Sequence, residues 1–378
     1  MNNPAGPGPI VRWLERCLMA WVVLGTPALA QDIVLAQIGP FTGVPVPDAR
    51  QISQGARAAV AHVNRSGGVA GRRIAWFELD DTLSPAVFAD QFDTAMQRKP
   101  VALISPWGSG AVQKMLGDKL LDRYDLVVMN VVPGSDAFRN PGHARLFHVR
   151  ASDLQKLSKI VLHARALSMR KLAVLYQNNP VGVAGLEDVV REAARIGGIE
   201  VKGVAVASEN LASGARETFG LGADGVLVLG APPFAASSVA QLRKAGVGQT
   251  IFLAADMSPE FLIRTAGHEA ARGVGIVQIY PDPNSKTGVR EFQAAMKAAF
   301  PELDAYTPAQ FEGYVSTRVA VEGLRRIRGD ITPGALAKAL QTMGEIAVDG
   351  YRLNFGKGNA GSQFVNIAVI DAKGRLRY

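Results

Sequence analysis

The sequence predicts an α/β protein built from two doubly wound lobes with a ligand cleft between them. From residue 32 onward, short apolar runs alternate with amphipathic stretches, which is typical of parallel strands covered by helices. The same alternation starts again after residue 150, so two halves of similar size follow one another. A chain of 378 residues, of which 48% are hydrophobic and 20% charged, can fill two such cores.

The first 30 residues have the organisation of a secretory signal peptide. Arg12 and Arg16 precede an apolar stretch at 17–24, and Ala28-Leu29-Ala30 supplies the small residues of a cleavage site. The apolar stretch is shorter than the roughly 20 residues that a membrane-spanning helix needs, although a retained N-terminal anchor is the alternative. We therefore expect cleavage after Ala30 and a periplasmic protein.

Cysteine and charge content agree with an exported protein. The only cysteine is Cys17, and Glu15 and Arg16 before it do not resemble the small residues of a lipoprotein processing site. The chain beyond residue 30 would hold no disulfide and would depend on its apolar cores. Lys and Arg number 41 against 33 Asp and Glu, a net charge of +8. No basic run has interleaved aromatic residues, which disfavours nucleic-acid binding.

The first half alternates strands and helices from residue 33 to residue 131. Gly67 and Gly68 permit a left-handed exit from the first helix, which is therefore expected to end near Asn64. Strands are predicted at 33–38, 74–79, 101–105 and 126–131, and helices at 51–64, 85–97 and 111–121.

The second half repeats the pattern and is followed by a helical remainder. Strands are predicted at 172–176, 200–206, 225–229, 251–254 and 275–279, and helices at 153–167, 184–196 and 235–245. The remainder contains helices at 287–300, 308–328 and 333–343 and closing strands at 351–353 and 364–370. Two halves in tandem without a long linker predict closely packed lobes.

Motifs of catalysis are missing from the sequence. There is no nucleophile elbow, no phosphate loop and no dinucleotide fingerprint after the first strand. The five histidines form no pair at metal-binding spacing. Asp80 and Asp81 are adjacent on a strand end, so their side chains should point to opposite faces and cap the next loop. We therefore expect no enzyme, no metal and no cofactor.

The loop after the third predicted strand is the best candidate binding site, because ligands of such sheets lie beyond the carboxyl ends of the strands. A helix begins near Ser109 and Gly110, and its free N–H groups with the Ser109 hydroxyl would receive a carboxylate. A plain N-cap is the other role for Ser109, and the two are compatible. Trp107 would either wall the pocket or plug the fold. Asp136, after Ser135, would accept a ligand donor or stabilise its own turn.

Several segments carry a resemblance to a known family. They are Ile38-Gly39-Pro40-Phe41-Thr42-Gly43, the stretches 55–60 and 64–74, the stretch 147–152, the stretch 173–179 with Gly182, and Arg272-Gly273-Val274. Across residues 32–378 the chain resembles the type I periplasmic solute-binding proteins of ABC transporters, the leucine/isoleucine/valine-binding family. The resemblance implies three crossovers, with residues 31–150 and 280–343 in the N-terminal lobe and residues 151–279 and 344–378 in the C-terminal lobe.

The resemblance also implies ligand residues. Ser109 matches the serine that receives an amino-acid carboxylate, and Asp256 most nearly matches the acid that receives the ammonium group. The ammonium-binding Ser or Thr after the fourth strand falls near Ser135 and Asp136. The chain departs from the family at Val181, where an aromatic residue is common, and at Asp48, where the first loop usually has an aromatic or small residue. An α-amino acid and a carboxylate without an ammonium group both stay open.

The expected function is solute binding. We expect an exported monomer that traps a small amino-acid-like or carboxylate solute by hinge closure and delivers it to the permease of an ABC importer. An exported sensor or regulatory module of the same fold is the main alternative, and a secreted hydrolase ranks third.

Overall fold

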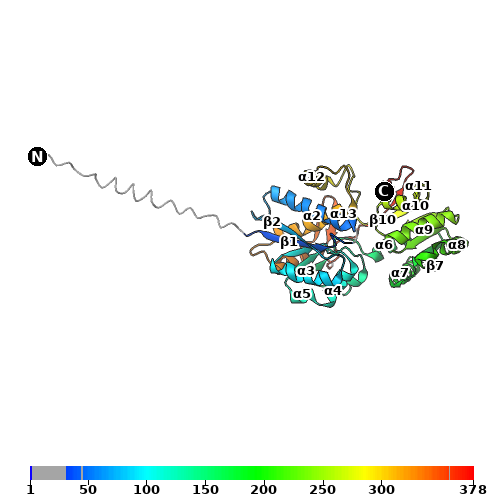
Figure 1. Ribbon diagram of the computed structural model, residues 1–378, viewed down its shortest axis with the longest axis horizontal. Coiled ribbons are helices and arrows are strands. Elements are labelled where there is room, and N and C mark those ends of the chain that lie inside the picture. The colour runs from blue at the N-terminus through cyan, green and yellow to red at the C-terminus, as the bar shows by residue number, and fades with distance from the viewer. Residues whose placement is uncertain (2–30, 44–45, 357) are drawn as a thin grey trace.

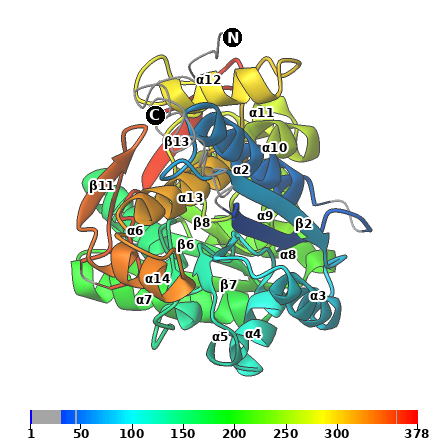
Figure 2. The same ribbon diagram turned by 90° about the vertical axis from the view of Figure 1, so that its left-hand side faces the viewer.

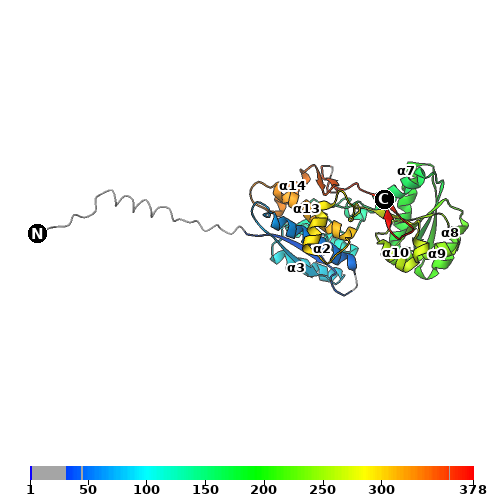
Figure 3. The same cartoon turned by 90° about the horizontal axis from the view of Figure 1, so that it is seen from above.

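The computed structural model describes Met1 and residues 31–43, 46–356 and 358–378, and these residues form two α/β lobes (Figure 1). The view from above shows the lobes side by side, joined by a few chain segments (Figure 3). The predicted signal peptide, apart from Met1, lies outside the described residues. Among the described helices none is both long enough and apolar enough to cross a membrane.

The first lobe has a five-stranded sheet in the order β2-β1-β3-β4-β5, with every neighbouring pair parallel. Apolar side chains alternate along β1: Leu35 belongs to the core under one helical layer, and Ala36 to the core under the other. The strands are β1 (Ile33–Gly39), β2 (Ile74–Asp80), β3 (Ala102–Ile104), β4 (Val127–Met129) and β5 (Leu146–Phe147).

Helices cover both faces of this sheet, as Figure 2 shows. One layer holds α2 (Pro47–Arg65) and α13 (Pro308–Arg325), with α12 (Arg290–Ala299) and α14 (Pro333–Gln341) beside them. The other layer holds α3 (Pro85–Gln97), α4 (Ser109–Gly117) and α5 (Leu120–Arg123). The sequence predicted one helix at 111–121; the structure divides it, because Lys119 adopts a left-handed conformation with φ 54° between α4 and α5.

The second lobe has a seven-stranded sheet in the order β14-β13-β10-β9-β8-β6-β7. Its parallel part comprises β6 (Lys171–Gln177), β7 (Glu200–Val206), β8 (Gly225–Leu229), β9 (Thr250–Leu253) and β10 (Gly275–Gln278). The antiparallel strands β13 (Asn366–Ile370) and β14 (Leu376–Arg377) extend the sheet beyond β10. The predicted two-lobe α/β architecture is thereby confirmed.

Helices also cover both faces of the second sheet. α6 (Asp153–Ala166) and α7 (Pro180–Ile196) pack together on one face, and α8 (Leu211–Gly220), α9 (Pro232–Lys244), α10 (Pro259–Ala266) and α11 (His268–Ala271) form the other layer. Short 3₁₀ turns occupy Asp136–Phe138 and Ser208–Asn210. The sequence analysis missed α8. The glycines of α8 weaken the helical signal in the sequence. In the structure Gly214 allows the helix to pack closely on β7, because a Cβ at this position would lie 2.3 Å from Cγ2 of Val206.

The hairpin of β11 (Glu345–Val348) and β12 (Tyr351–Asn354) packs with the first lobe. The Tyr351 ring lies 6.1 Å from that of Phe311 on α13, and Phe355 lies 5.6 Å from Phe147 on β5. The chain therefore enters the second lobe only after this hairpin, and not at residue 344 as we expected. The short strands gave no sign of this, since their partners are 40 or more residues away.

Candidate functional site

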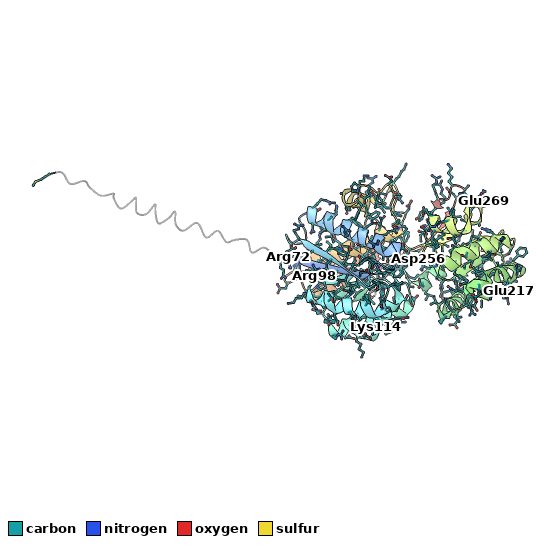
Figure 4. All side chains as sticks on the ribbon, in the orientation of Figure 1. Arg72, Arg98, Lys114, Glu217, Asp256 and Glu269 are labelled. Atoms are coloured by element: carbon teal, nitrogen blue, oxygen red, sulfur yellow. The ribbon has the colours of Figure 1, made fainter. Side chains whose placement is uncertain are left out.

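The carboxyl-terminal edges of the two parallel sheets face each other near the three segments that join the lobes, around Val149, Ile279 and Ser362, which we call the hinge. Arg150, which follows β5 of the first lobe, pairs with Asp256, which follows β9 of the second lobe, at 2.5 Å. Figure 4 places Asp256 at the boundary between the lobes. Because strands of one parallel sheet end at one edge, the loops after β1, β2, β3 and β4 lie on the same side as Arg150.

The loop after β3 leads directly into the start of α4. Its N-cap is Gly108, with φ 96° and no side-chain cap, so the plain N-cap role proposed for Ser109 is not what the structure shows. Ser109 is the first helical residue and is exposed. Intrahelical bonding starts with the N–H of Val112, which donates to the Gly108 carbonyl, so the amides of Ser109 and Gly110 precede the ladder. This helix end is open to an acceptor.

Close packing fixes the position of this helix end. A Cβ on Gly110 would lie 2.8 Å from Cγ of Pro85, the first residue of α3. Ser105, at the end of β3, is fully buried with φ 47°, and its Oγ has no partner among the described residues. The start of α4 is thus held close to the start of α3, and glycine is needed at position 110 for that reason.

Apolar side chains surround the loop. Built on Gly39, a Cβ would lie 3.4 Å from the Phe41 ring and 3.9 Å from Cβ of Trp107. Built on Gly108, it would lie 3.6 Å from Cδ1 of Leu83, which is 38% exposed. On the second lobe, Val181 at the start of α7 is 80% exposed. Sequence reasoning had not included Phe41 or Leu83 among the site residues.

A cluster of ionic groups lies at the hinge. The Arg150 side chain is 3% exposed; its Nη1 donates to the Val132 carbonyl and lies 3.5 Å from Oε1 of Glu312 on α13. Lys156 on α6 lies 2.8 Å from Asp153 and 3.2 Å from both carboxylate oxygens of Asp256. Asp256 therefore contacts two nearly buried cations, one from each lobe.

Burial and neighbouring charges have opposite effects on the pKa values of the carboxyl groups in and near this cluster. Although desolvation disfavours its charge, Lys156 and Arg150 hold the pKa of Asp256 below its ordinary value. Burial raises the pKa of Glu312 in spite of Arg150 and of Asn130, whose amide donates to Oε1 of Glu312 at 2.7 Å. Desolvation and the charge of Asp256 raise the pKa of Asp48, opposed by Arg150. Asp48 and Asp256 thus repel each other across the lobes.

Ser135 and Asp136 hold the first crossover. Oγ of Ser135 accepts from the N–H of Ala137 at 3.4 Å, and Oδ2 of Asp136 accepts from the N–H of Leu154 at 2.9 Å. Arg139 donates to the carbonyls of Gly134 and Ser135 at 2.7 and 3.1 Å. Asp136 therefore has a structural role, one of the two roles that the sequence left open. Its hydrogen bond joins the loop to α6, however, and does not stabilise the turn that contains Asp136.

Asp80 and Asp81 serve the loops beside them, as predicted from their position. Oδ1 of Asp80 accepts from the N–H groups of Phe41 and Thr82 at 2.9 and 3.0 Å. Oδ1 of Asp81 accepts from the N–H of Leu83 at 2.9 Å. Neither forms a catalytic pair with the other. Among the described residues no group of three or more His, Cys, Asp or Glu side chains could hold a metal ion.

Trp107, Ser109 and Gly110 lie where the loop after β3 enters α4, and Asp256 is linked to the first lobe through Arg150. Sequence reasoning missed Arg150, Lys156 and Glu312. One signal was available: Glu312 interrupts an apolar face of the helix predicted at 308–328, and a buried acid needs a partner. Arg150 and Lys156 gave no comparable signal.

Comparison with known proteins agrees with this architecture. The family model for periplasmic binding proteins matches residues 32–375. An extracellular ligand-binding receptor of Verminephrobacter eiseniae is 47% identical, with a TM-score of 0.85, and the match covers 92% of this chain and 100% of that one. An amino acid binding protein of Pseudomonas aeruginosa is 26% identical over 79% of this chain and 80% of its own length.

A further relative has a signalling role. BasB, the substrate-binding protein of a chemotactic signal transduction system in Halobacterium salinarum, is 25% identical over 75% of this chain and 67% of its own length. The family match spans residues of both lobes, and the two-lobe α/β fold agrees with it. The chain therefore belongs to the type I periplasmic binding proteins, the family of leucine/isoleucine/valine-binding proteins that its sequence resembles.

Proposed function

We propose that the protein is the exported substrate-binding component of an ABC importer, cleaved after Ala30 and acting as a monomer. It binds a small amino-acid-like or carboxylate solute between its lobes and delivers it to the permease. The observation that carries this proposal is the open start of α4 at Ser109, on the sheet edge from which Arg150 reaches Asp256 of the other lobe.

The first lobe receives the anionic end of the solute. The hydroxyl of Ser109 and the amides of Ser109 and Gly110 precede the hydrogen-bonded ladder of α4 and are free to donate. The positive end of the helix dipole adds to the attraction for a carboxylate. Charge-assisted hydrogen bonds of this kind are about twice as strong as neutral ones.

The second lobe contributes Asp256, whose side chain is 44% exposed even though two cations contact it. An ammonium group placed beside Asp256 would also relieve its repulsion with Asp48. This favours a solute with an amino group. A carboxylate solute that has no amino group would contact Ser109 and would place no cation near Asp48 or Asp256. Substitution of Asp256 should therefore weaken binding of an amino acid but not of a simple carboxylate.

Strand order places the apolar side chains farther from the hinge than the ionic groups. Arg150 follows β5 at one edge of the first sheet, the Ser109 loop follows β3 in the middle, and Leu83 follows β2 at the opposite edge. On the second lobe Val181 follows β6, two strands beyond β9 and Asp256. The solute would therefore direct its charged groups to the hinge and its hydrocarbon part toward Leu83 and Val181, away from the hinge.

A thermal-shift screen of the exported protein tests the proposal. The panel holds amino acids, amides, dicarboxylates and aromatic acids, each measured with Ser109→Ala and Asp256→Ala and with the remote controls Ser66→Ala and Asp118→Ala. A solute at about 100 times its dissociation constant stabilises the folded state by about 2.7 kcal/mol, a shift of a few degrees.

An amino acid that acts on the wild type and on both controls, but on neither site variant, supports the amino-acid form of the proposal. A simple carboxylate that ignores Asp256→Ala supports the carboxylate form. Loss of the shift in the controls, a shift that survives Ser109→Ala, or no shift with any compound contradicts the proposed site. Turnover of a bound compound would instead indicate the hydrolase alternative.

A sensor is the second candidate function, because BasB is a relative with a signalling role. The same fold would then report bound solute to a membrane receptor. Uptake of the radiolabelled solute by cells with and without the gene separates the two. Import requires that deletion lower uptake, whereas a sensor leaves uptake unchanged and alters movement toward the solute or expression of other genes.

A further inference from the structure

A basic groove on the first lobe lies away from the solute cleft. It has a volume of about 600 Å³ between α2 and β2, lined by Arg57, Val60, Ala61, Asn64, Arg65, Arg73 and Trp76. Its residues come from the second half of α2 and the start of β2, toward the amino ends of the strands, and the proposed solute site lies at their carboxyl ends. Figure 4 shows Arg72, which precedes β2, at the end of the lobe remote from the second lobe.

The groove is positively charged and uncompensated. Arg57, Arg65 and Arg73 are exposed, and their side chains form neither an ion pair nor a hydrogen bond with any described residue. The nearby acid Glu78 already accepts from Nε1 of Trp76 at 2.7 Å and from Ser53. Desolvation is the main cause that lowers the pKa of His62 on α2, and the positive charge of Arg65 lowers it further. An anionic partner would complement this field.

One wall of the groove is an unpaired strand edge. β2 is the outermost strand of the sheet and pairs only with β1. The side chain of Asn64 bonds both backbone groups of Ile74, at 2.8 and 2.9 Å, and so occupies the outward edge there. In a parallel strand the outward groups recur at every second residue, so those of Trp76 and Glu78 face the same edge without a strand partner.

We propose that this groove docks an extended acidic segment of a partner protein. The segment would add a strand to the edge of β2 at Trp76 and Glu78, and its carboxylates would pair with Arg57, Arg65 and Arg73. Edge pairing supplies affinity through main-chain hydrogen bonds, and the arginines supply the preference for acidic side chains. A concave groove with a strand edge suits an extended peptide better than a flat membrane surface.

Fluorescence anisotropy with a labelled peptide of alternating glutamate and valine tests the charge part. The triple variant Arg57→Gln, Arg65→Gln, Arg73→Gln should weaken binding by roughly tenfold, because three exposed charge pairs are lost. The triple variant Arg216→Gln, Arg272→Gln, Arg290→Gln removes the same charge from exposed positions elsewhere and should bind as the wild type does. Equal weakening in both triple variants would show a nonspecific charge effect and overturn the proposal.

Hydrogen exchange on the wild type tests the strand part. Bound peptide should slow amide exchange in residues 74–80, and the same peptide with every backbone nitrogen methylated should bind weakly and give no such protection. Equal binding of the methylated peptide, protection confined to other segments, or no binding at all overturns the proposal. So does a wild type that sediments with anionic vesicles but ignores the peptide. Solute binding should be unchanged in the groove variant, since the groove and the cleft lie at opposite strand ends.

Discussion

Asp81 is a carboxyl group that the fold buries without full compensation. Its side chain is 1% exposed, and Oδ2 has no hydrogen-bond partner among the described residues. Burial raises the pKa of Asp81 to about 6, against the N–H of Leu83, which lowers it. In the unfolded chain the pKa would be near 3.9. Between these values the folded state binds the extra proton, so the contribution of Asp81 to stability is lost as pH rises through 4 to 6.

We predict that Asp81→Asn changes the pH dependence of stability. Relative to the variant, the wild type should lose about 1 kcal/mol of unfolding free energy between pH 5 and pH 7. Urea unfolding at the two pH values measures the difference. Asp80→Asn is the control, because the Thr42 hydroxyl and three backbone N–H groups outweigh desolvation and lower the pKa of Asp80. Its stabilisation is lost only as pH falls below about 4, so this variant should parallel the wild type between pH 5 and pH 7. Parallel curves for wild type and Asp81→Asn would contradict the prediction.

Arg150 should be the most costly ionic residue of the hinge to remove. Arg150→Met leaves Glu312, whose side chain is 6% exposed, without a cation, and leaves Asp256 with Lys156 alone. Removing one partner of a buried pair destabilises by about 3 kcal/mol. Urea or thermal unfolding of the single variant measures this loss.

A double-mutant cycle separates the ion pair from other effects of the substitution. Adding Glu312→Gln to Arg150→Met removes the unpaired charge and should recover about 1 kcal/mol or more, while Glu312→Gln alone should destabilise. The side-chain amide introduced by Glu312→Gln can still accept the hydrogen bond from Asn130. If the effects of the two substitutions simply add, the pair contributes nothing and the interpretation of the hinge cluster is wrong.

At the scale of elements, α2 and α13 touch through their backbones. A Cβ on Gly55 of α2 would lie 1.8 Å from the Gln310 carbonyl oxygen, and one on Gly313 of α13 would lie 1.9 Å from the Ile52 carbonyl oxygen. Both distances are too short for any side chain. The two glycines therefore set how closely these helices approach. Glu312, which contacts Arg150, is adjacent to Gly313 on α13.

We predict that Gly313→Ala destabilises the protein by about 3 kcal/mol, at the upper end for overpacking, because helix backbones cannot give way as a flexible side chain can. Gly117→Ala is the matched control: it also lies in a helix, but a Cβ there meets nothing within 4 Å. Alanine should leave that position unchanged or slightly more stable. Thermal unfolding of the two variants gives the comparison, and similar melting temperatures would contradict it.

Over the whole molecule, Tyr351 holds the three crossovers together. Its hydroxyl lies 2.9 Å from the Val149 carbonyl, 3.2 Å from the Ile279 carbonyl and 2.6 Å from Oγ of Ser362. These residues belong to the first, second and third passage between the lobes. A single buried hydroxyl therefore links the three segments that join the lobes.

We predict that solute binding brings the two lips of the cleft together. Spin labels on Leu83→Cys and Val181→Cys in residues 31–378, which contain no other cysteine, should show a shorter distance when the solute identified by the thermal-shift screen is added. A label pair on Val181→Cys and Leu167→Cys, both in the second lobe and exposed, should not change. An unchanged distance across the lips would exclude closure, even if the solute binds.

Most of the fold follows from local patterns in the sequence. Apolar runs and Gly or Pro turns predicted most strands and helices to within a few residues, since both depend on neighbours along the chain. α8, α10 and α11 escaped because they are short and their apolar faces become clear only against the second sheet. β11 was not predicted, and residues 344–378 were all assigned to the second lobe. The hairpin instead contacts Phe311 and Phe147 of the first lobe, which are distant in sequence.

The family, the two-lobe architecture and the open loop at Ser109 were therefore determined by the sequence, because short segments with fixed spacing encode them. Only the tertiary structure decided the ionic hinge. Arg150 meets Asp256 and Glu312 across 106 and 162 residues. No local pattern can report such a contact, because it exists only once three crossovers have brought the carboxyl ends of both sheets to one place.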